Sequence, residues 1–215
     1  MTIENGDMVL VEYIGRKKDG EIFDLTDEEK AKEEGIYAEE IDYSPIPVLV
    51  GSEYVIEGFE EALKEMEVGE EKEIEVPVEK AYGERDSDNV KTFPEREFKK
   101  QGVNVRPGEE IMVGDRRGKV VSKGSGRVRV DFNHPLSGED LNYWLKVVKK
   151  VEDDEEKARN IFEYRVGHGS IEVEDGVATV DHSHEGHDHE MPEDLKENLR
   201  EEILENTGLE EVRFE

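Results

Sequence analysis

Apolar and polar positions follow two different periods in the first part of the chain. Residues 7–13 and 71–76 alternate apolar and polar side chains, which is typical of strands in a sheet with one buried face. Between them, in residues 51–69, apolar side chains recur every three or four positions and predict a short amphipathic helix. A single helix among such strands should lie across the buried face. Val55 and Ile56 would then form the floor of a pocket.

Turn residues and caps predict the elements around this helix. Lys18-Asp19-Gly20 lies between two alternating runs and predicts a hairpin. Residues 26–34 predict a short surface helix with Thr26 as its cap. Two prolines keep the extended run 43–50 away from a central position in the sheet.

The middle of the chain changes character and predicts a small β-rich unit, residues 84–130, which we call the insert. Its expected strands and its one short helix cover, in order, residues 90–93, 94–100 (the helix), 110–113, 118–122 and 127–131. After the insert, Leu141, Tyr143, Leu145 and Val147 alternate with polar residues and predict a return to a core strand.

The last part of the chain, residues 152–215, predicts a further domain of helices and strands. Asp175-Gly176 is a hairpin turn between two short apolar runs, and residues 192–206 form an amphipathic helix pattern. A domain of roughly 60 residues is near the lower limit for independent stability. We therefore expect it to dock or to form a homodimer, and we expect the activity of the preceding residues not to require it.

Charge and composition restrict the partners. The chain of 215 residues has 58 acidic and 29 basic residues, a net charge of −29. Such a charge argues against nucleic acid and anionic membranes. No apolar run reaches the roughly 20 residues of a membrane span, and no signal peptide is visible, so a cytoplasmic protein is expected. The absence of cysteine excludes disulfides and thiol chemistry.

Four motifs, taken in order, carry a resemblance to a known family. They are VLVEYIG at 9–15 with DGEIFD at 19–24, VIEGFEEAL at 55–63, AYG at 81–83, and DFNHPLSG at 131–138. Together they resemble the FKBP family of peptidyl-prolyl isomerases over most of residues 1–151. The insert resembles the insert-in-flap domain of SlyD-type members. The tail resembles, less specifically, the extra domain of long archaeal-type members.

The resemblance implies an α+β fold in three parts. Residues 1–83 and 131–151 would form the catalytic FKBP domain, an antiparallel β-sheet wrapped on a short helix. Residues 84–130 would form a chaperone domain, and residues 152–215 a C-terminal domain resembling an α/β sandwich.

The resemblance also implies rotamase activity that requires no cofactor. Rotating an X–Pro bond breaks amide resonance against a barrier of roughly 18–20 kcal/mol, and an apolar cage that excludes water favours the twisted amide without nucleophile, base or metal. Ile56 N–H and the Tyr82 hydroxyl would donate to substrate carbonyls. Asp24 would either face the twisted carbonyl or hold Tyr13 in place. The positions that match the family's pocket are Tyr13, Phe23, Asp24, Val55, Ile56, Phe59, Tyr82 and Phe132, with Leu141 as a weaker match.

Unfolded or proline-containing polypeptides are the implied partners. The insert has more apolar residues than a unit of its size readily buries, so some should remain exposed to bind such chains. The residues expected to do so are Phe93, Phe98, Ile111, Met112 and Val121. The alternative is that they all form a small core with no client surface.

Two features leave other functions open. Phe59 stands where many family members have tryptophan, which keeps open a binding-only chaperone with a vestigial pocket. The alternation of histidines with acids in DHSHEGHDHE suits Ni or Zn and keeps open a metal-handling protein; the alternative there is a solvated acidic loop. The candidate ligands are His182, His184, His187 and His189.

Overall fold

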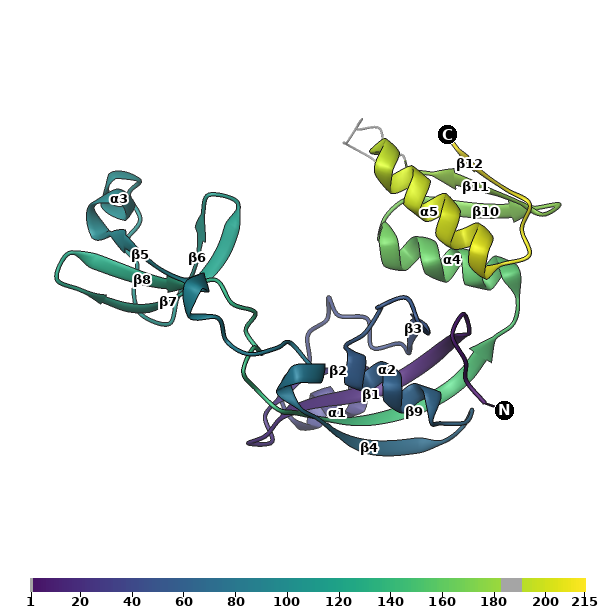
Figure 1. The fold of residues 1–215 in the computed structure, drawn as a ribbon, viewed down its shortest axis with the longest axis horizontal. Coiled ribbons are helices and arrows are strands. Elements are labelled where there is room, and N and C mark those ends of the chain that lie inside the picture. Colours follow the sequence, from purple (N-terminus) through teal and green to yellow (C-terminus); the bar gives the residue numbers. More distant parts are fainter. Residues whose placement is uncertain (1, 183–190) are drawn as a thin grey trace. The chain divides into compact units, whose positions relative to one another are not determined.

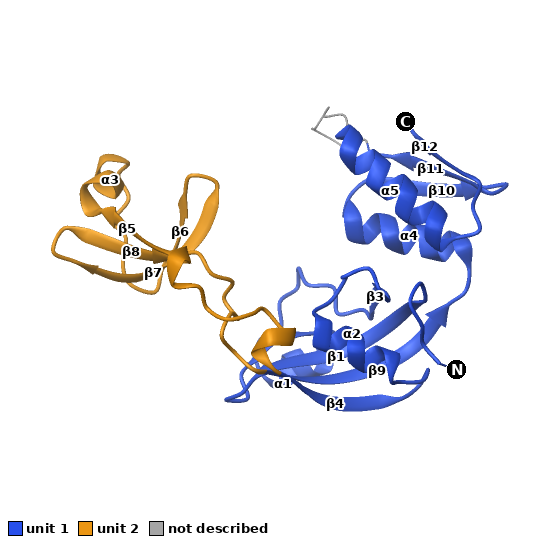
Figure 2. Ribbon diagram, viewed as in Figure 1, with its two compact units in different colours: residues 1–76, 141–215 blue, residues 77–140 orange. Residues whose placement is uncertain are grey.

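The computed structural model describes residues 2–182 and 191–215, and the chain divides into two compact units (Figure 2). The first unit combines Met1–Val76 with Leu141–Glu215, and the second is Pro77–Asp140. The second unit therefore contains the predicted insert together with a short segment on each side of it. None of the described helices is both long and apolar enough to cross a membrane.

An antiparallel sheet of five strands forms the body of the first unit. Its strands are β1 (Met8–Lys17), β2 (Ile22–Leu25), β3 (Ile46–Leu49), β4 (Glu71–Val76) and β9 (Leu141–Val151). The order is β2-β1-β9-β4, and β3 pairs with the first half of β1. The two strands at the centre, β1 and β9, come from opposite ends of the body. The insert therefore lies between them in the sequence. This confirms the α+β fold class that the resemblance implies.

The helix α2 (Glu57–Lys64) contacts β4. It lies across one face of the sheet in Figure 1. A Cβ atom on Gly58 would lie 2.6 Å from the Val76 side chain, so glycine is what allows this close approach. The helix is shorter than the apolar pattern of residues 51–69. Ile56 is its N-cap in an extended conformation, so Val55 and Ile56 lie just before the first turn.

The cap of the surface helix α1 (Glu28–Glu33) differs from the prediction. Asp27 is the N-cap, and its carboxylate accepts from the backbone N–H of Lys30 at 2.8 Å. The hydroxyl of Thr26 instead accepts from the backbone N–H of Tyr13 at 2.8 Å. The assignment of Thr26 as the cap was wrong because its side chain is buried and bonded to β1. The next polar residue, Asp27, caps the helix instead.

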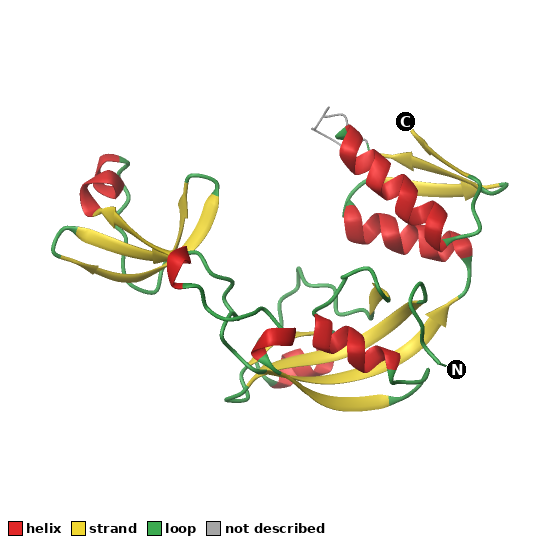
Figure 3. Cartoon of the chain, viewed as in Figure 1, coloured by secondary structure: helices red, strands yellow, loops and turns green. Residues whose placement is uncertain are grey.

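The C-terminal part of the first unit places two helices on one face of a three-stranded sheet (Figure 3). Its elements are α4 (Asp154–Arg165), β10 (Ser170–Glu174), β11 (Val177–Asp181), α5 (Glu193–Asn206) and β12 (Glu211–Phe214). The hairpin predicted at Asp175-Gly176 is confirmed, since β10 and β11 pair around it and both turn residues have positive φ. The final strand pairs in parallel with β11.

This C-terminal domain contacts the body of the first unit through aromatic residues. The rings of Tyr54 and Tyr164 stack with centroids 3.7 Å apart, and the Tyr164 hydroxyl donates to the Tyr54 carbonyl at 3.0 Å. Arg165 lies 5.0 Å from the Tyr54 ring and forms two hydrogen bonds to Glu202 of α5, at 2.6 and 2.7 Å. Burial, with the nearby Glu202 carboxylate, raises the pKa of Tyr54, so its phenol remains neutral.

The second unit is built on a four-stranded antiparallel sheet of order β5-β8-β7-β6. Its elements are the 3-10 turns η1 (Val78–Lys80) and η2 (Ser87–Asn89), then β5 (Val90–Pro94), α3 (Glu95–Lys100), β6 (Glu110–Val113), β7 (Arg116–Gly124) and β8 (Arg127–Asp131). Phe98 of α3 packs with buried valines of the following loop, β7 and β8 to form a core. The insert therefore has a core of its own, on one face of its sheet.

Candidate active site

Three aromatic rings of the first unit gather around a fourth, Tyr143 of β9. Its ring centroid lies 5.4 Å from Phe59, 5.7 Å from Phe23 and 6.2 Å from Tyr13. Tyr13 and Phe59 are themselves 5.7 Å apart. Three of these four contacts are edge-to-face, an arrangement that aromatic pairs favour. We call Tyr13, Phe23, Phe59 and Tyr143 the aromatic cluster.

The close approach of Phe23 to Tyr143 depends on Gly15. A Cβ atom at this position would lie 2.6 Å from the Phe23 ring and 3.0 Å from the Tyr143 ring. Such distances are too short for any side chain, so glycine at the end of the VLVEYIG motif leaves room for both rings. The strands β1, β2 and β9 thus position three members of the cluster, and α2 supplies the fourth.

Asp24 contacts the cluster through a hydrogen bond with Tyr13. The Tyr13 hydroxyl donates to its carboxylate at 2.5 Å, and Asp24 itself is exposed. Of the two roles considered for Asp24, the structure shows the one in which it holds Tyr13. A role facing the substrate carbonyl stays a prediction.

Val55 and Ile56 lie half-buried at the start of α2. The carbonyl of Ile56 accepts from the N–H groups of Phe59 and Glu60 at 3.0 and 3.1 Å, and no side chain caps the helix. The Tyr54 carbonyl, one residue before Val55, is the group that Tyr164 binds. The segment predicted to form the pocket floor is therefore held from one side by α2 and from the other by the C-terminal domain.

Tyr143 is the member of the cluster that sequence reasoning missed. The candidate chosen on this strand was Leu141, which is fully buried two residues earlier. Both residues belong to the buried face of β9, where the burial pattern alternates regularly. The alternating pattern could have identified Tyr143, because residues two positions apart on a strand lie on the same face. Tyr143 therefore shares the face of Leu141.

The two remaining pocket candidates lie in the second unit. The ring of Tyr82 stacks on His134 at 3.9 Å, and 37% of the residue is exposed. Phe132 lies edge-to-face with Phe93 at 6.1 Å, and Arg116 lies 4.6 Å from its ring. Phe132 therefore packs against the insert core in this structure. Roles for Tyr82 and Phe132 in binding proline stay predictions.

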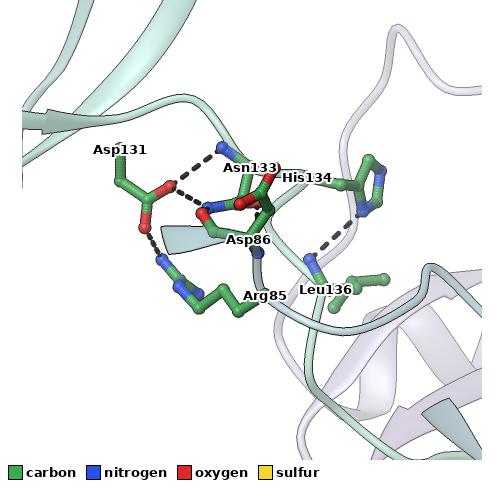
Figure 4. Close-up of polar contacts among 6 residues, drawn as sticks. All are labelled: Arg85, Asp86, Asp131, Asn133, His134 and Leu136. Atoms are coloured by element: carbon green, nitrogen blue, oxygen red, sulfur yellow. Dashed lines mark hydrogen bonds and ion pairs between the residues drawn. The ribbon is translucent and has the colours of Figure 1, made fainter. Parts of the chain in front are cut away.

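Figure 4 shows the polar contacts that join the chain entering the insert to the chain leaving it. Asp131 forms an ion pair with Arg85 and accepts from the backbone and side-chain N–H groups of Asn133 at 2.9 and 2.7 Å. Asn133 also exchanges hydrogen bonds with the backbone of Asp86. Burial alone would raise the pKa of Asp131, but the hydrogen bonds from Asn133 and the ion pair outweigh it and hold the pKa below its ordinary value.

His134 follows directly after this network. Its Nδ1 accepts from the backbone N–H of Leu136 at 3.2 Å, and partial burial lowers the pKa of the imidazole. Both effects favour the neutral ring that stacks on Tyr82. His134 is thus a structural residue of this loop.

The insert residues expected to meet clients differ in exposure. Phe98 is buried in the insert core, and Phe93 and Ile111 are half-buried against it. Met112 is 60% exposed and Val121 is 47% exposed. Of these five residues, only Met112 and Val121 are exposed to solvent.

Three of the four histidines proposed as metal ligands, His184, His187 and His189, lie outside the described residues. His182 is described, and its Nε2 lies 2.7 Å from Nε2 of His168, which precedes β10. In the described ranges 2–182 and 191–215, no group of three metal-binding side chains comes together. The metal site stays a prediction.

The aromatic cluster contains no pair of nucleophile and base, and it lies on a sheet crossed by one short helix. The antiparallel sheet with one short helix across it agrees with the fold expected of the FKBP class. The family description FKBP-type peptidyl-prolyl cis-trans isomerase matches residues 1–99, and the IF domain of FKBP26 matches residues 91–136.

Relatives agree with this class. The chain is 41% identical to a short-type peptidyl-prolyl cis-trans isomerase of Methanocaldococcus jannaschii over 145 residues, which is 67% of this chain and 92% of the relative. It is 32% identical to SlyD of Treponema pallidum, covering 72% of this chain and 83% of the relative. It is 29% identical to SlyD of Aeromonas hydrophila, covering 85% and 73%. The chain belongs to the FKBP-type peptidyl-prolyl cis-trans isomerase family and is a rotamase.

Proposed function

We propose that the protein isomerises prolyl bonds in unfolded polypeptides, which the insert holds while the aromatic cluster receives the proline. The observation that carries this proposal is that the aromatic cluster and the exposed apolar residues Met112 and Val121 lie in different units. One contains the aromatic cluster, and the other has its own core and leaves Met112 and Val121 exposed. A methionine suits a surface that must adapt to many sequences.

The chemistry follows from the side chains of the cluster. The twisted amide loses its charge-separated resonance form, so an apolar environment favours it over the planar amide. Tyr13, Phe23, Phe59 and Tyr143 offer such an environment, and the proline ring would pack against their faces. Asp24 keeps the Tyr13 hydroxyl engaged, so that the ring keeps its orientation. No bond is made or broken, and no metal is needed, so exchange should survive chelators.

The test of the cluster is proline exchange measured by NMR on a short peptide. Tyr143→Ala should lower the exchange rate strongly, because it removes the ring that contacts the other three. Trp144→Ala is the matched control, since Trp144 is the adjacent aromatic on β9 and its side chain points to the other face of the strand. Equal loss in the two variants would show that only the strand, and not the cluster, matters.

The test of the insert is its replacement by a short Gly/Ser loop from residue 85 to 129. Exchange in a short peptide should stay within a few-fold of normal, because the cluster lies in the other unit. Proline-limited refolding of a whole protein should slow sharply, and suppression of aggregation should fall with it. Loss of both activities together would mean that the insert shapes the proline site, and loss of neither would remove the chaperone proposal.

A further inference from the structure

The insert sheet has one covered face and one open face. On β8, Val128 and Val130 are buried in the core with α3, whereas Arg127 and Arg129 alternate with them and are exposed. Successive residues of a strand point to opposite faces, so the two arginines lie on the face that α3 does not cover.

Neighbouring strands extend this basic surface. Lys119 of β7 is exposed and lies opposite Asp131 of β8, on the same face as the two arginines. Arg117 lies two residues earlier on β7 and is also exposed. We call Arg117, Lys119, Arg127 and Arg129 the cationic face.

These four cations have little neutralisation within the protein. Arg117 lies 3.8 Å from the exposed Glu110, which is a long contact for an ion pair. In the part of the chain that the structure describes, Lys119, Arg127 and Arg129 form no ion pair within 4.0 Å. Two acids lie on this face: Glu110, which is opposite Lys119, and Asp131, which is engaged by Arg85 and Asn133. Positive charge is therefore left available to a partner.

The cationic face belongs to a domain whose net charge is opposite in sign to that of the whole chain. The insert, residues 84–130, has 12 basic and 8 acidic residues, whereas the whole chain has 29 basic and 58 acidic residues. The insert thus has a net charge of +4, and the excess of negative charge in the protein lies outside the insert. An excess of positive charge on one domain attracts partners with negative charge.

Apolar groups accompany the charges. Met112 of β6 lies directly opposite Arg117, which places its exposed side chain on the cationic face. Val121 is the extra residue of the bulge between Val120 and Ser122, and it is exposed on β7. Arg127 and Arg129 also line a hollow of about 380 Å³ with Thr92 and Ser122. Charge and apolar contact are thus offered together.

We propose that the cationic face binds segments of unfolded polypeptide in which Asp or Glu alternates with apolar residues. The proposal rests on the function proposed above and adds the class of client that the insert prefers. Carboxylates would pair with the arginines and lysine, and the apolar residues would contact Met112 and Val121. A polypeptide suits this face better than nucleic acid, because the exposed side chains of Met112 and Val121 gain contacts from apolar residues and none from phosphates.

The test compares three fluorescent, unstructured peptides binding to the full-length protein. They share length and apolar residues and differ only in having Glu, Gln or Lys at the polar positions. The Glu peptide should bind more tightly than the Gln peptide, and the Lys peptide most weakly. The advantage of Glu should shrink at about 1 M salt, where the screening length is about 3 Å.

The variant R127Q/R129Q locates the effect. It should weaken binding of the Glu peptide about fivefold, the scale of two exposed ion pairs, and leave the Gln peptide unchanged. The matched control is R96Q/K100Q, which makes the same charge change on the exposed surface of α3. Hydrogen-exchange protection of β5 to β8 should be unchanged in both variants, which shows that the insert still folds.

Each outcome decides one point. Equal binding of the Glu and Gln peptides to the unaltered protein would overturn the preference for acidic clients and leave the chaperone function standing. Binding of none of the three would overturn the chaperone function itself. Equal losses in R127Q/R129Q and R96Q/K100Q would show a general charge effect and refute the cationic face. Tighter binding of a single-stranded oligonucleotide than of the Glu peptide would identify a nucleic-acid surface instead.

Discussion

The insert and the C-terminal domain are both additions to the same sheet, and they bury their apolar surface in different ways. The insert packs Phe98 against its own valines and forms a compact unit. The C-terminal domain also has buried residues of its own, but it places Tyr164 and Arg165 on Tyr54 of the body. The body and the C-terminal domain consequently form one compact unit. The C-terminal domain therefore shares a compact unit with the aromatic cluster, whereas the insert does not.

The largest effect should come from breaking the contact between the C-terminal domain and the body. Tyr54→Ala removes a ring that is only 7% exposed and stacked on Tyr164, so it should lower the free energy of unfolding of the first unit by about 3 kcal/mol. Denaturant unfolding measures this. Tyr37→Ala is the control, because Tyr37 is 43% exposed and its removal should cost about 0.5 kcal/mol. Similar losses would mean that the stacking adds nothing.

Phe98→Ala should cause a loss of comparable size that is confined to the insert. Removing the aromatic centre of so small a core costs about 3 kcal/mol, so β5 to β8 should lose protection in hydrogen exchange. The strands β1 and β9 should keep theirs, and exchange of a short prolyl peptide should remain within a few-fold of normal. The exposed Met112 provides the control Met112→Ala, with unchanged protection. Loss of protection in β1 or β9 would contradict the independence of the insert.

A smaller effect should follow from removing one hydroxyl group. Tyr164→Phe keeps the stacked ring but loses the hydrogen bond to the Tyr54 carbonyl, at a cost of about 1 kcal/mol. Because that carbonyl precedes Val55, exchange of a short prolyl peptide should also slow by a few-fold. Tyr43→Phe is the matched control, since it too loses one hydrogen bond, from Ala38 N–H at 3.0 Å. If both variants catalyse alike, the C-terminal domain stabilises the body without positioning Val55 and Ile56. That result would support the expectation from sequence that catalysis does not require this domain.

The smallest effect is a loss of stability at low pH, where the chain enters and leaves the insert. Because the pKa of Asp131 lies below its ordinary value of 3.8 in the folded protein, the unfolded chain binds this proton more readily. The stabilisation by Asp131 is therefore complete above about pH 4 and is lost as the pH falls through the lowered folded pKa. Amide exchange at Asn133, followed by NMR, should accelerate there. Asp131→Asn should abolish this step, and a step that persists in the variant would belong to another carboxylate.

Much of the architecture follows from local patterns in the sequence. Period-two alternation places β1, β4 and β9, the Asp175-Gly176 turn places the last hairpin, and the insert strands begin and end close to the expected residues. These features depend on neighbours within a few positions, where side-chain direction and turn geometry decide the backbone. The four FKBP motifs identified the family, which the matches to residues 1–99 and to the three relatives support.

The tertiary structure decided what depends on partners far away in the chain. Asp27 caps α1 because Thr26 is engaged by β1, and Tyr143 joins the aromatic cluster because β9 pairs with β1 across more than 100 residues of sequence. The stacking of Tyr164 on Tyr54 also joins residues far apart in the chain. Such a contact produces no periodic pattern in the sequence of either segment. The sequence by itself determined which segments form strands and helices and to which family they belong. Which side chains then share a contact depended on the pairing of distant strands and on the helices packed against them.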